Sequence, residues 1–395
     1  MNNFRLQIPT TIVFGPGVFA SLGVETAAVG RRALLATYAD NGALAGLLQR
    51  IGELLNGAGV EVELFDRVES NPRHDTCDEG ARLARESGCD LVLALGGGSV
   101  IDAAKAIAAA TATGHSCWDF CRRPGGLVEV TAALPVVAVP TTAATGSEAN
   151  CEAVITNWRA HEKCVLSSSL IFPRIAVCDP ELHLTLPRDA TADGCVDILS
   201  HCLEGYLSGE DDCSPQDRLT EGLINVVLEW GPVAVADGRN LRARRELQYA
   251  GLLAISDIAH AGRGGTWLMH NIEHALSGHY DIAHGRGMAV VVPRVMRFFE
   301  EFVPDRLARL GERCFDLACG GAKETAGRAV DALVRWLGLI GRNLTLGDVG
   351  IGDEKFETLA EDVIRNDGDG AFYHSVAPLD SGAIVEILRR CTEPN

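Results

Sequence analysis

The first half of the chain alternates short apolar runs with helix-like segments, and this alternation restricts the fold more than any other feature. Four runs rich in aliphatic residues are bounded by Gly, Pro or Asp and predict buried strands: ALLATY (33–38), LVLAL (91–95), PVVAV (135–139) and RIAVC (174–178). Helical patterns such as GALAGLLQRIGELLNGAG (42–59) and SVIDAAKAIAAATATG (99–114) separate them. Strands connected through helices imply βαβ units and a parallel sheet covered on both faces.

The pattern changes after LPRDATADG (186–194). Beyond this segment the chain consists mainly of long amphipathic patterns such as RLTEGLINVVLEW (218–230), which predict helices. One run, AVVVP (289–293), has the composition of a strand but lies among helical signals. We therefore predict an α/β domain over residues 1–187 and an all-helical domain over residues 188–395.

Composition limits the class of protein. The 395 residues, 47% of them hydrophobic and 22% charged, are enough for a sizeable core, and a net charge of −18 argues against nucleic acid or an anionic membrane as a partner. Thirteen cysteines without a CxxC pair favour reduced thiols. We see no signal peptide, and the longest apolar runs are too short to span a bilayer. We expect a soluble cytoplasmic protein.

A glycine-rich turn follows the second predicted strand, in LVLALGGGSVIDAAKAIA (91–108). Gly96, Gly97 and Gly98 allow a sharp turn and a close approach of the backbone to a ligand. Ser99 is a candidate helix cap, with Asp102 three residues later as its reciprocal partner. The start of such a helix attracts anions, and a pyrophosphate fits that role. The motif is not GxGxxG, however, and a plain tight βα turn is the alternative.

A second polar turn, VPTTAATGSEAN (139–150), follows the next predicted strand. Two turns at the carboxyl ends of neighbouring parallel strands suit a ligand that lies across the edge of the sheet.

Histidines are concentrated in HNIEHALSGHYDIAH (270–284). On a helix, His270 and His274 share one face, and a bend in the segment that follows would return His284 to them. An earlier segment, ADGCVDILSHCLEGYL (192–207), places Asp197 and His201 one helical turn apart among apolar residues.

A purely structural interpretation of these residues is an Asp–His ion pair together with hydrogen-bonded core histidines. Because an unpaired buried charge is costly, two such pairs together with His284 favour a divalent metal instead. One carboxylate with several imidazoles suits Zn²⁺ or Fe²⁺, and the lack of thiolate ligands indicates a catalytic site. Cys195 and Cys202 flank the Asp–His pair but lie off its face, so we expect them in the core.

The motifs, in their order, resemble the iron-containing (group III) alcohol dehydrogenase family, and the histidine segment is most similar to its butanol dehydrogenase and aldehyde reductase branch. The resemblance extends from about residue 10 to residue 300, and more faintly beyond. It is carried by five segments: GGGSVIDAAK (96–105), PTTAATGSE (140–148), DPEL (179–182), DGCVDILSHCLE (193–204) and the histidine segment.

The resemblance implies a nucleotide-binding α/β domain, a helical domain of the dehydroquinate synthase-like type, and metal and substrate between the two. It implies metal ligation by Asp197, His201, His270 and His284, with His274 off the metal beside the nicotinamide. His279 matches no ligand position. The resemblance also implies assembly as a homodimer or a larger homo-oligomer.

The resemblance also gives roles to residues of the α/β domain. The glycine turn, with Ser99 and Asp102, would hold the pyrophosphate. Thr141 and Thr142 would line the cofactor cleft together with Ser147, and Lys163 would lie near the ribose.

One departure from the family bears on the choice of cofactor. Members of the branch usually carry a Gly- and Ser-rich turn after the first strand, and it accepts the 2′-phosphate of NADP. Here the segment is TYADNGAL (37–44), in which Asp40 would hydrogen-bond a free ribose 2′-hydroxyl and repel a phosphate. A solvated turn is the alternative role for Asp40. The sequence favours NAD(H), with NADP(H) left open.

The expected reaction is hydride transfer between the cofactor and a small primary alcohol or aldehyde, with the metal stabilising the alkoxide or polarising the carbonyl. His274 is a candidate proton relay, or a residue that orients a ligand. Aromatic residues are candidates for pocket walls or for core: Trp118, Phe120, Trp267 and Tyr280. Arg263 and Arg286 flank the histidine segment, so an anionic substrate is left open as an alternative. The alternatives are a polyol dehydrogenase, another dehydroquinate synthase-like enzyme, and a non-catalytic metal-binding scaffold.

Overall fold

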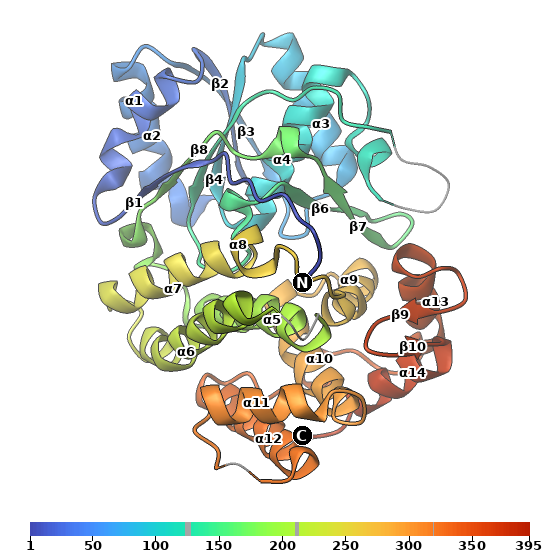
Figure 1. The fold of residues 1–395 in the computed structure, drawn as a ribbon. Helices are drawn as coiled ribbons and strands as arrows, with labels where there is room; N and C mark the ends of the chain where they lie inside the picture. Colours follow the sequence, from blue (N-terminus) through green and yellow to red (C-terminus); the bar gives the residue numbers. More distant parts are fainter. Residues whose placement is uncertain (123–127, 210–212, 319) are drawn as a thin grey trace. The chain divides into compact units, whose positions relative to one another are not determined.

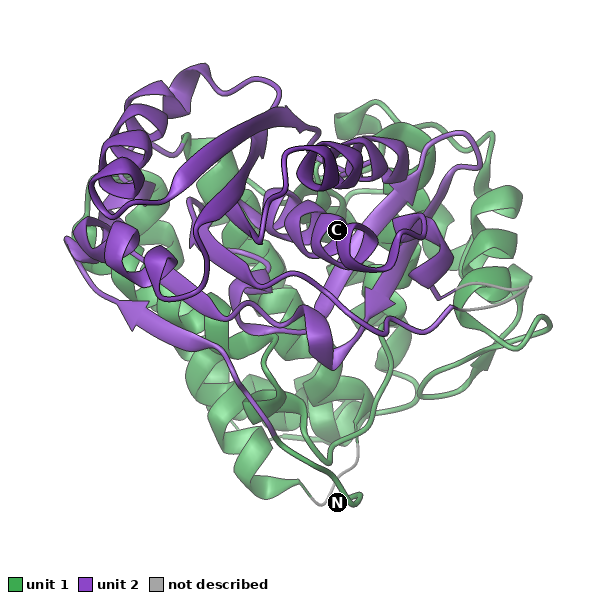
Figure 2. Ribbon diagram, turned by 90° about the horizontal axis from the view of Figure 1, so that it is seen from above, with its two compact units in different colours: residues 1–6, 187–395 green, residues 7–186 purple. Residues whose placement is uncertain are grey.

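The computed structural model describes residues 1–122, 128–209, 213–318 and 320–395. The chain forms two compact units, coloured separately in Figure 2. The first, Gln7–Leu186, contains the sheet, and the second combines Pro187–Asn395 with Met1–Leu6. The first six residues thus belong to the helical unit. The sequence analysis had placed them in the α/β domain. The backbone N–H of Asn2 donates to the carbonyl of Gly262 at 2.8 Å.

The α/β unit is built on a six-stranded sheet with the order β1-β8-β5-β4-β2-β3, and every neighbouring pair is parallel. The four predicted strands are confirmed as β2, β4, β5 and β8; β1 and β3 complete the sheet. The strands are β1 (Thr11–Phe14), β2 (Arg32–Tyr38), β3 (Glu61–Val68), β4 (Leu91–Gly96), β5 (Val136–Pro140) and β8 (Ile175–Cys178).

Helices cover both faces of the sheet (Figure 1). On one face, alternate strand residues such as Leu93 and Val137 pack in one core cluster with Leu55 of α2. On the other face, Phe65 of β3 packs near α3, which in turn lies against α4. These helices are α1 (Leu22–Ala27), α2 (Ala45–Gly57), α3 (His74–Glu86) and α4 (Gly98–Thr113). Strands β6 (Glu152–Asn157) and β7 (Glu162–Ser167) form a separate antiparallel pair.

The second unit is helical. The run AVVVP, which is ambiguous in the sequence, lies inside α10, where its residues are buried. The helices are α5 (Arg188–Ser208), α6 (Ser214–Ala236), α7 (Leu241–Ala254), α8 (Asp257–His260), α9 (Leu268–Tyr280), α10 (His284–Phe299), α11 (Pro304–Cys314), α12 (Ala322–Leu339), α13 (Phe356–Asp367) and α14 (Ser381–Arg390). A short antiparallel pair, β9 (Tyr373–His374) and β10 (Pro378–Leu379), precedes α14.

Short 3₁₀ helices connect these elements. They are Val18–Ser21, Gly42–Leu44, Cys117–Phe120, Ser147–Ala149, Ser169–Ile171, Pro180–His183 and Gly347–Val349.

By length and composition alone, α6 is apolar enough to cross a membrane. It packs against α5, α7 and α11, and it carries polar residues that are buried in the unit. Asp217 of α6 forms ion pairs with Arg263 at 3.1 Å and with Arg306 at 3.2 Å. These features are those of a core helix in a polar network.

Candidate active site

Helix α5 supplies one side of a cluster of carboxylate and imidazole groups. Asp197 and His201 are four residues apart, so both point to the same side of this 21-residue helix. Both side chains are buried, at 2% and 5% exposure. Cys195 and Cys202 are also buried and are free thiols, as the sequence indicated.

The other side of the cluster comes from α9 and α10. His270 lies in the first turn of α9, and the helix ends where Asp281 adopts a left-handed backbone with φ 55°. The chain then turns and α10 begins at His284. A Cβ atom at Gly285 would lie 2.2 Å from the carbonyl oxygen of Asp193, so only glycine lets the start of α10 approach α5 this closely.

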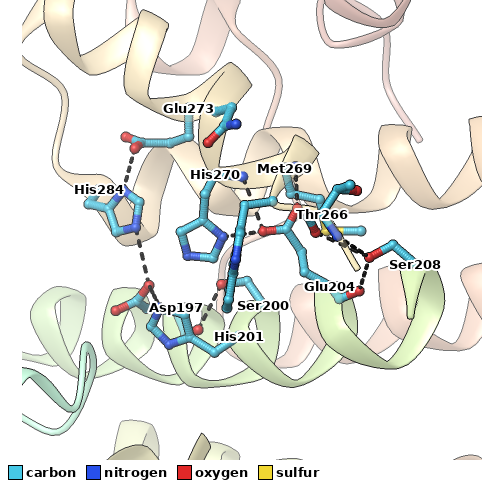
Figure 3. Close-up of polar contacts among 12 residues, drawn as sticks. Asp197, Ser200, His201, Glu204, Ser208, Thr266, Met269, His270, Glu273 and His284 are labelled. Atoms are coloured by element: carbon cyan, nitrogen blue, oxygen red, sulfur yellow. Dashed lines mark hydrogen bonds and ion pairs between the residues drawn. The ribbon is translucent and has the colours of Figure 1, made fainter. Parts of the chain in front are cut away.

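The four side chains converge (Figure 3). His284 Nε2 lies 3.3 Å from Asp197 Oδ1, and His201 Nε2 lies 3.8 Å from the same oxygen. The rings of His201 and His270 are stacked, with centroids 4.8 Å apart and planes at 16°. Candidate ligand atoms of Asp197, His201 and His270 all lie within 4.8 Å of one another. The structure therefore brings together the four residues to which the resemblance assigns the metal.

The donor set fits a divalent cation. Asp197 Oδ1, the oxygen that the Nε2 atoms of His201 and His284 approach, is buried and accepts no hydrogen bond from the residues that the structure describes. Burial opposes ionisation of Asp197, but the imidazoles of His201 and His284 outweigh it and hold its pKa below the usual range. Burial lowers the pKa of His201 to about 3. A carboxylate and a neutral imidazole are the forms that bind metals.

Two buried glutamates, which the sequence analysis did not single out, complete the cluster. Glu204 Oε2 is hydrogen-bonded to His270 Nδ1, and Glu273 Oε2 to His284 Nδ1 (Figure 3). Burial raises the pKa of Glu204. The hydrogen bonds from the backbone N–H groups of Met269 and His270 lower it, but burial has the larger effect. A sequence signal was present, because each glutamate follows a candidate ligand histidine by three residues on an apolar helix.

His274 lies beside the cluster, with its ring centroid 6.2 Å from that of His270 and 5.7 Å from that of His284. Ligand atoms of Glu273, His274 and His284 also lie within 4.8 Å of one another. Glu273 and His284 are hydrogen-bonded to each other through Nδ1, however, so this second group is less suited to a cation than the first.

His279 lies elsewhere on α9. Its Nε2 is 2.7 Å from Asp362 Oδ2 of α13. The structure gives this histidine a carboxylate partner of its own, outside the cluster.

Of the aromatic and arginine candidates in the helical unit, only Trp267 lies against the cluster, and the other three have partners elsewhere among the described residues. The Trp267 ring lies 5.3 Å from that of His270 and forms part of the cluster's wall. Tyr280 instead contacts Lys355, whose Nζ is 5.0 Å from its ring. Arg263 is fully buried in its ion pair with Asp217, and Arg286 pairs with Asp193 at 3.0 Å. Neither arginine has the geometry of a free anion-binding group.

In the α/β unit, the glycine turn lies where β4 runs into α4. The helix begins at Gly98 with Gly97 as its N-cap, and no side chain caps it. The predicted capping box is therefore wrong. Ser99 lies inside the helix and its hydroxyl donates to the carbonyl of Ser70. The N-cap is thus Gly97, two residues before the predicted cap, with an extended backbone at φ −81° and ψ −168°.

Asp102 and Ser147 belong to a buried network. Asp102 Oδ1 accepts from Ser147 Oγ at 2.5 Å, and Oδ2 accepts from the N–H of Val154 at 2.9 Å. Lys105 Nζ donates to Ser147 Oγ and to Asn150 Oδ1, both at 2.8 Å. Because both carboxylate oxygens of Asp102 are bonded within the protein, its role is to join the two polar turns. The expected contact of this carboxylate with a pyrophosphate stays a prediction.

The remaining candidates surround the carboxyl ends of β2, β4 and β5. In the strand order, β2 and β4 are neighbours while β3 lies on the far side of β2, so a topological switch point falls between β2 and β4. Gly97 N donates to the hydroxyl of Tyr38, the last residue of β2, at 3.1 Å. A Cβ atom at Gly97 would lie 2.7 Å from Thr142 Oγ1. The turns of β4 and β5 thus pack directly on each other.

Three other candidates have separate surroundings. Asp40 is exposed just beyond β2, and Thr141 is buried with its N–H donating to the carbonyl of Gly96 at 2.9 Å. Lys163 on β7 donates to Asn71 Oδ1 at 3.1 Å. Trp118 and Phe120 are buried, at 8% and 1% exposure, which is typical of core residues.

Comparison with known proteins agrees with this arrangement. The model of the family "iron-containing alcohol dehydrogenase" matches residues 9–180, and the C-terminal model of the Fe-containing alcohol dehydrogenase family matches residues 191–392. A probable NADH-dependent butanol dehydrogenase of Bacillus subtilis is 36% identical over 94% of this chain and 96% of its own length. The NADPH-dependent aldehyde reductase YqhD of Escherichia coli is 31% identical over 89% and 90%.

Solved structures give the same result. The crystal structure of NADH-dependent butanol dehydrogenase A from Thermotoga maritima has a TM-score of 0.94 and 32% sequence identity, and the match covers 100% of this chain and 99% of that one. Fold and comparisons together define an alcohol dehydrogenase or aldehyde reductase. The chain belongs to the iron-containing alcohol dehydrogenase family.

Proposed function

We propose that the protein is a metal-dependent, NAD(H)-preferring dehydrogenase that interconverts small primary alcohols and aldehydes. The observation that carries the proposal is the convergence of Asp197, His201, His270 and His284 on one buried point. Fe²⁺ and Zn²⁺ both suit one carboxylate with three imidazoles. When bound, such a metal supplies Lewis-acid polarisation of the substrate oxygen.

The chain's own residues have separate tasks in this proposal. Asp197 supplies the negative charge that offsets the cation, and the three imidazoles supply neutral nitrogen donors. His274, buried beside His284, would accept or return the proton of the alcohol at a ring nitrogen. The apolar face of Trp267 would keep water away from the reacting carbon.

The preference for NAD(H) rests on the end of β2. Asp40 is exposed at the carboxyl end of this strand, at the switch point where an open parallel sheet binds a dinucleotide. A carboxylate there would accept a hydrogen bond from a ribose 2′-hydroxyl and repel a 2′-phosphate. Relatives named for NADH and a relative named for NADPH both occur, so the family alone does not decide the cofactor.

An uncharged substrate is favoured over an anionic one. Arg263 and Arg286, the two arginines that flank the histidine segment, are held in ion pairs by Asp217 and Asp193. A polyol dehydrogenase stays the second candidate, because a relative named 1,3-propanediol dehydrogenase, from Citrobacter freundii, is 32% identical over 98% of this chain. Every cysteine that the structure describes is a free thiol, which supports our proposal of a cytoplasmic protein. We further propose a homodimer or larger homo-oligomer.

The direct test is NADH absorbance in the presence of butanal, glyceraldehyde and other aldehydes. Protein stripped with chelator and then loaded with Fe²⁺ or Zn²⁺ should oxidise NADH, with butanal preferred to glyceraldehyde, and stripped protein should not. Equal rates with and without metal would refute the metal-dependent reaction, and no turnover of any aldehyde would favour a non-catalytic scaffold.

A further inference from the structure

Each imidazole supplied by α9 and α10 to the cluster is hydrogen-bonded by a glutamate from behind. Glu204 contacts His270 through Nδ1, and Glu273 contacts His284 through Nδ1 (Figure 3). The two glutamates are 2% and 0% exposed. Burying two carboxylates costs several kcal/mol each unless their partners compensate, so their presence needs a reason.

Glu204 ties α5 to the first turn of α9. Besides the His270 ring, its carboxylate accepts from the backbone N–H groups of Met269 and His270, the latter at 3.3 Å. These are orphan donors at the start of a helix whose N-cap, Trp267, offers no side-chain hydrogen bond. One carboxylate from α5 therefore fixes both the start of α9 and the orientation of the ring.

Glu273 is held between its own helix and the next. Its Oε1 accepts from Ser277 Oγ, four residues along α9, while Oε2 contacts His284 at the start of α10. A Cβ atom at Gly287 would lie 2.8 Å from Glu273 Cγ and Oε1, so the first turn of α10 closes tightly over the carboxylate. These contacts hold the side chain in the position from which it reaches His284.

The third imidazole has no such support. His201 Nδ1 has no hydrogen-bond partner within the described part of the chain, and its ring is positioned by stacking on His270 at 4.8 Å. Orientation therefore passes from Glu204 to His270 and, through the stack, to His201.

We propose that Glu204 and Glu273 are the positioning residues of the metal centre. Each accepts the Nδ1 proton of one histidine, so that Nε2 faces the metal. Neither is a ligand and neither touches the substrate. The inference rests on the proposed metal-dependent function and identifies what orients its ligands.

Co²⁺ binding to stripped protein tests the inference, because the visible bands of Co²⁺ report both affinity and coordination geometry. Glu273→Ala and Glu204→Ala should weaken Co²⁺ binding roughly 10- to 100-fold and shift the bands at saturation. Glu273→Gln keeps an acceptor for His284 and should restore the wild-type bands with part of the affinity.

Asp362→Asn is the matched control. It alters a carboxylate–histidine pair outside the cluster, between Asp362 of α13 and His279 of α9, the helix that also carries His270. This variant should bind Co²⁺ with wild-type affinity and bands.

Three results would overturn the inference. Wild-type affinity and bands in all glutamate variants would show that the carboxylates do not position the ligands. An equal loss in Asp362→Asn would show general loosening of the helices. Failure of the wild-type protein to bind Co²⁺ would remove the proposed metal site itself, and the inference with it.

Discussion

At the scale of single residues, His279 shows that closeness to the ligand histidines in sequence does not imply closeness in space. It lies in the histidine-rich segment, yet Asp362 holds its Nε2 at 2.7 Å, away from the cluster. His279→Ala should therefore leave bound metal, measured by elemental analysis of purified protein, at the wild-type stoichiometry. His270→Ala is the comparison that should lose it. A metal-free His279→Ala protein would contradict the assignment.

Asp40 is the residue on which cofactor choice depends. Asp40→Gly removes a negative charge at the exposed end of β2, so the ratio of kcat/KM for NADPH to that for NADH should rise about tenfold, which corresponds to about 1.4 kcal/mol. Glu61→Gln removes an equal charge at the amino end of the neighbouring strand β3, away from the carboxyl end where Asp40 lies, and should leave the ratio unchanged. An unchanged ratio in Asp40→Gly would show that this carboxylate does not face the ribose.

Sequence patterns identified residues whose chemistry is rare in a core, but not those whose role depends on a partner. Asp197 and His201 stand out because an acid and an imidazole share one apolar helical face. Glu204 and Glu273 do not, because glutamate is common on helices and each finds its histidine only when α5, α9 and α10 pack together. The buried partners of Asp102 were missed for the same reason, because they lie 45 and 52 residues away.

At the scale of the elements, the 3₁₀ helix Ser147–Ala149 carries a buried acid. Glu148 is 4% exposed, and burial raises its pKa to about 7. An acid with a higher pKa in the folded state than in the unfolded state binds more protons when folded, so its contribution to stability falls as pH rises from about 4.5 to about 7.

Glu148→Gln should remove that dependence. Between pH 5 and pH 8 the free energy of unfolding of the wild-type protein should fall by up to about 3 kcal/mol more than that of the variant. Urea denaturation at the two pH values measures the difference. An equal change in the free energy of unfolding of both proteins between the two pH values would show that burial does not raise the pKa of Glu148.

Element types followed from local patterns, whereas their ends did not. Apolar runs bounded by Gly, Pro or Asp identified four strands of the sheet, but β3 (EVELFDRV) mixes charged and apolar residues because it lies at the edge. The run AVVVP reads as a strand in isolation, and only its continuity with the residues from His284 to Phe299 makes it helical. Helix α4 starts at Gly98, where no side chain caps it, so the serine pattern that favours a cap at Ser99 does not locate the start.

At the scale of the whole molecule, the chain divides its chemistry between two units. The sheet unit has two polar turns joined through Lys105, Asp102 and Ser147 at the carboxyl ends of its strands. The helical unit has the carboxylate–imidazole cluster. In the proposed reaction, the cofactor would supply the hydride chemistry, and a cation held by the cluster would polarise the substrate oxygen.

The central claim is that hydride passes between a nicotinamide and an aldehyde carbon only when the four-residue cluster is intact. NADH deuterated at the transferred C4 position, incubated with butanal and metal-loaded protein, should give butanol labelled at C1 by mass spectrometry. Asp197→Asn protein and chelator-stripped protein should give none. Undiminished deuterium transfer by Asp197→Asn or by stripped protein would contradict the account.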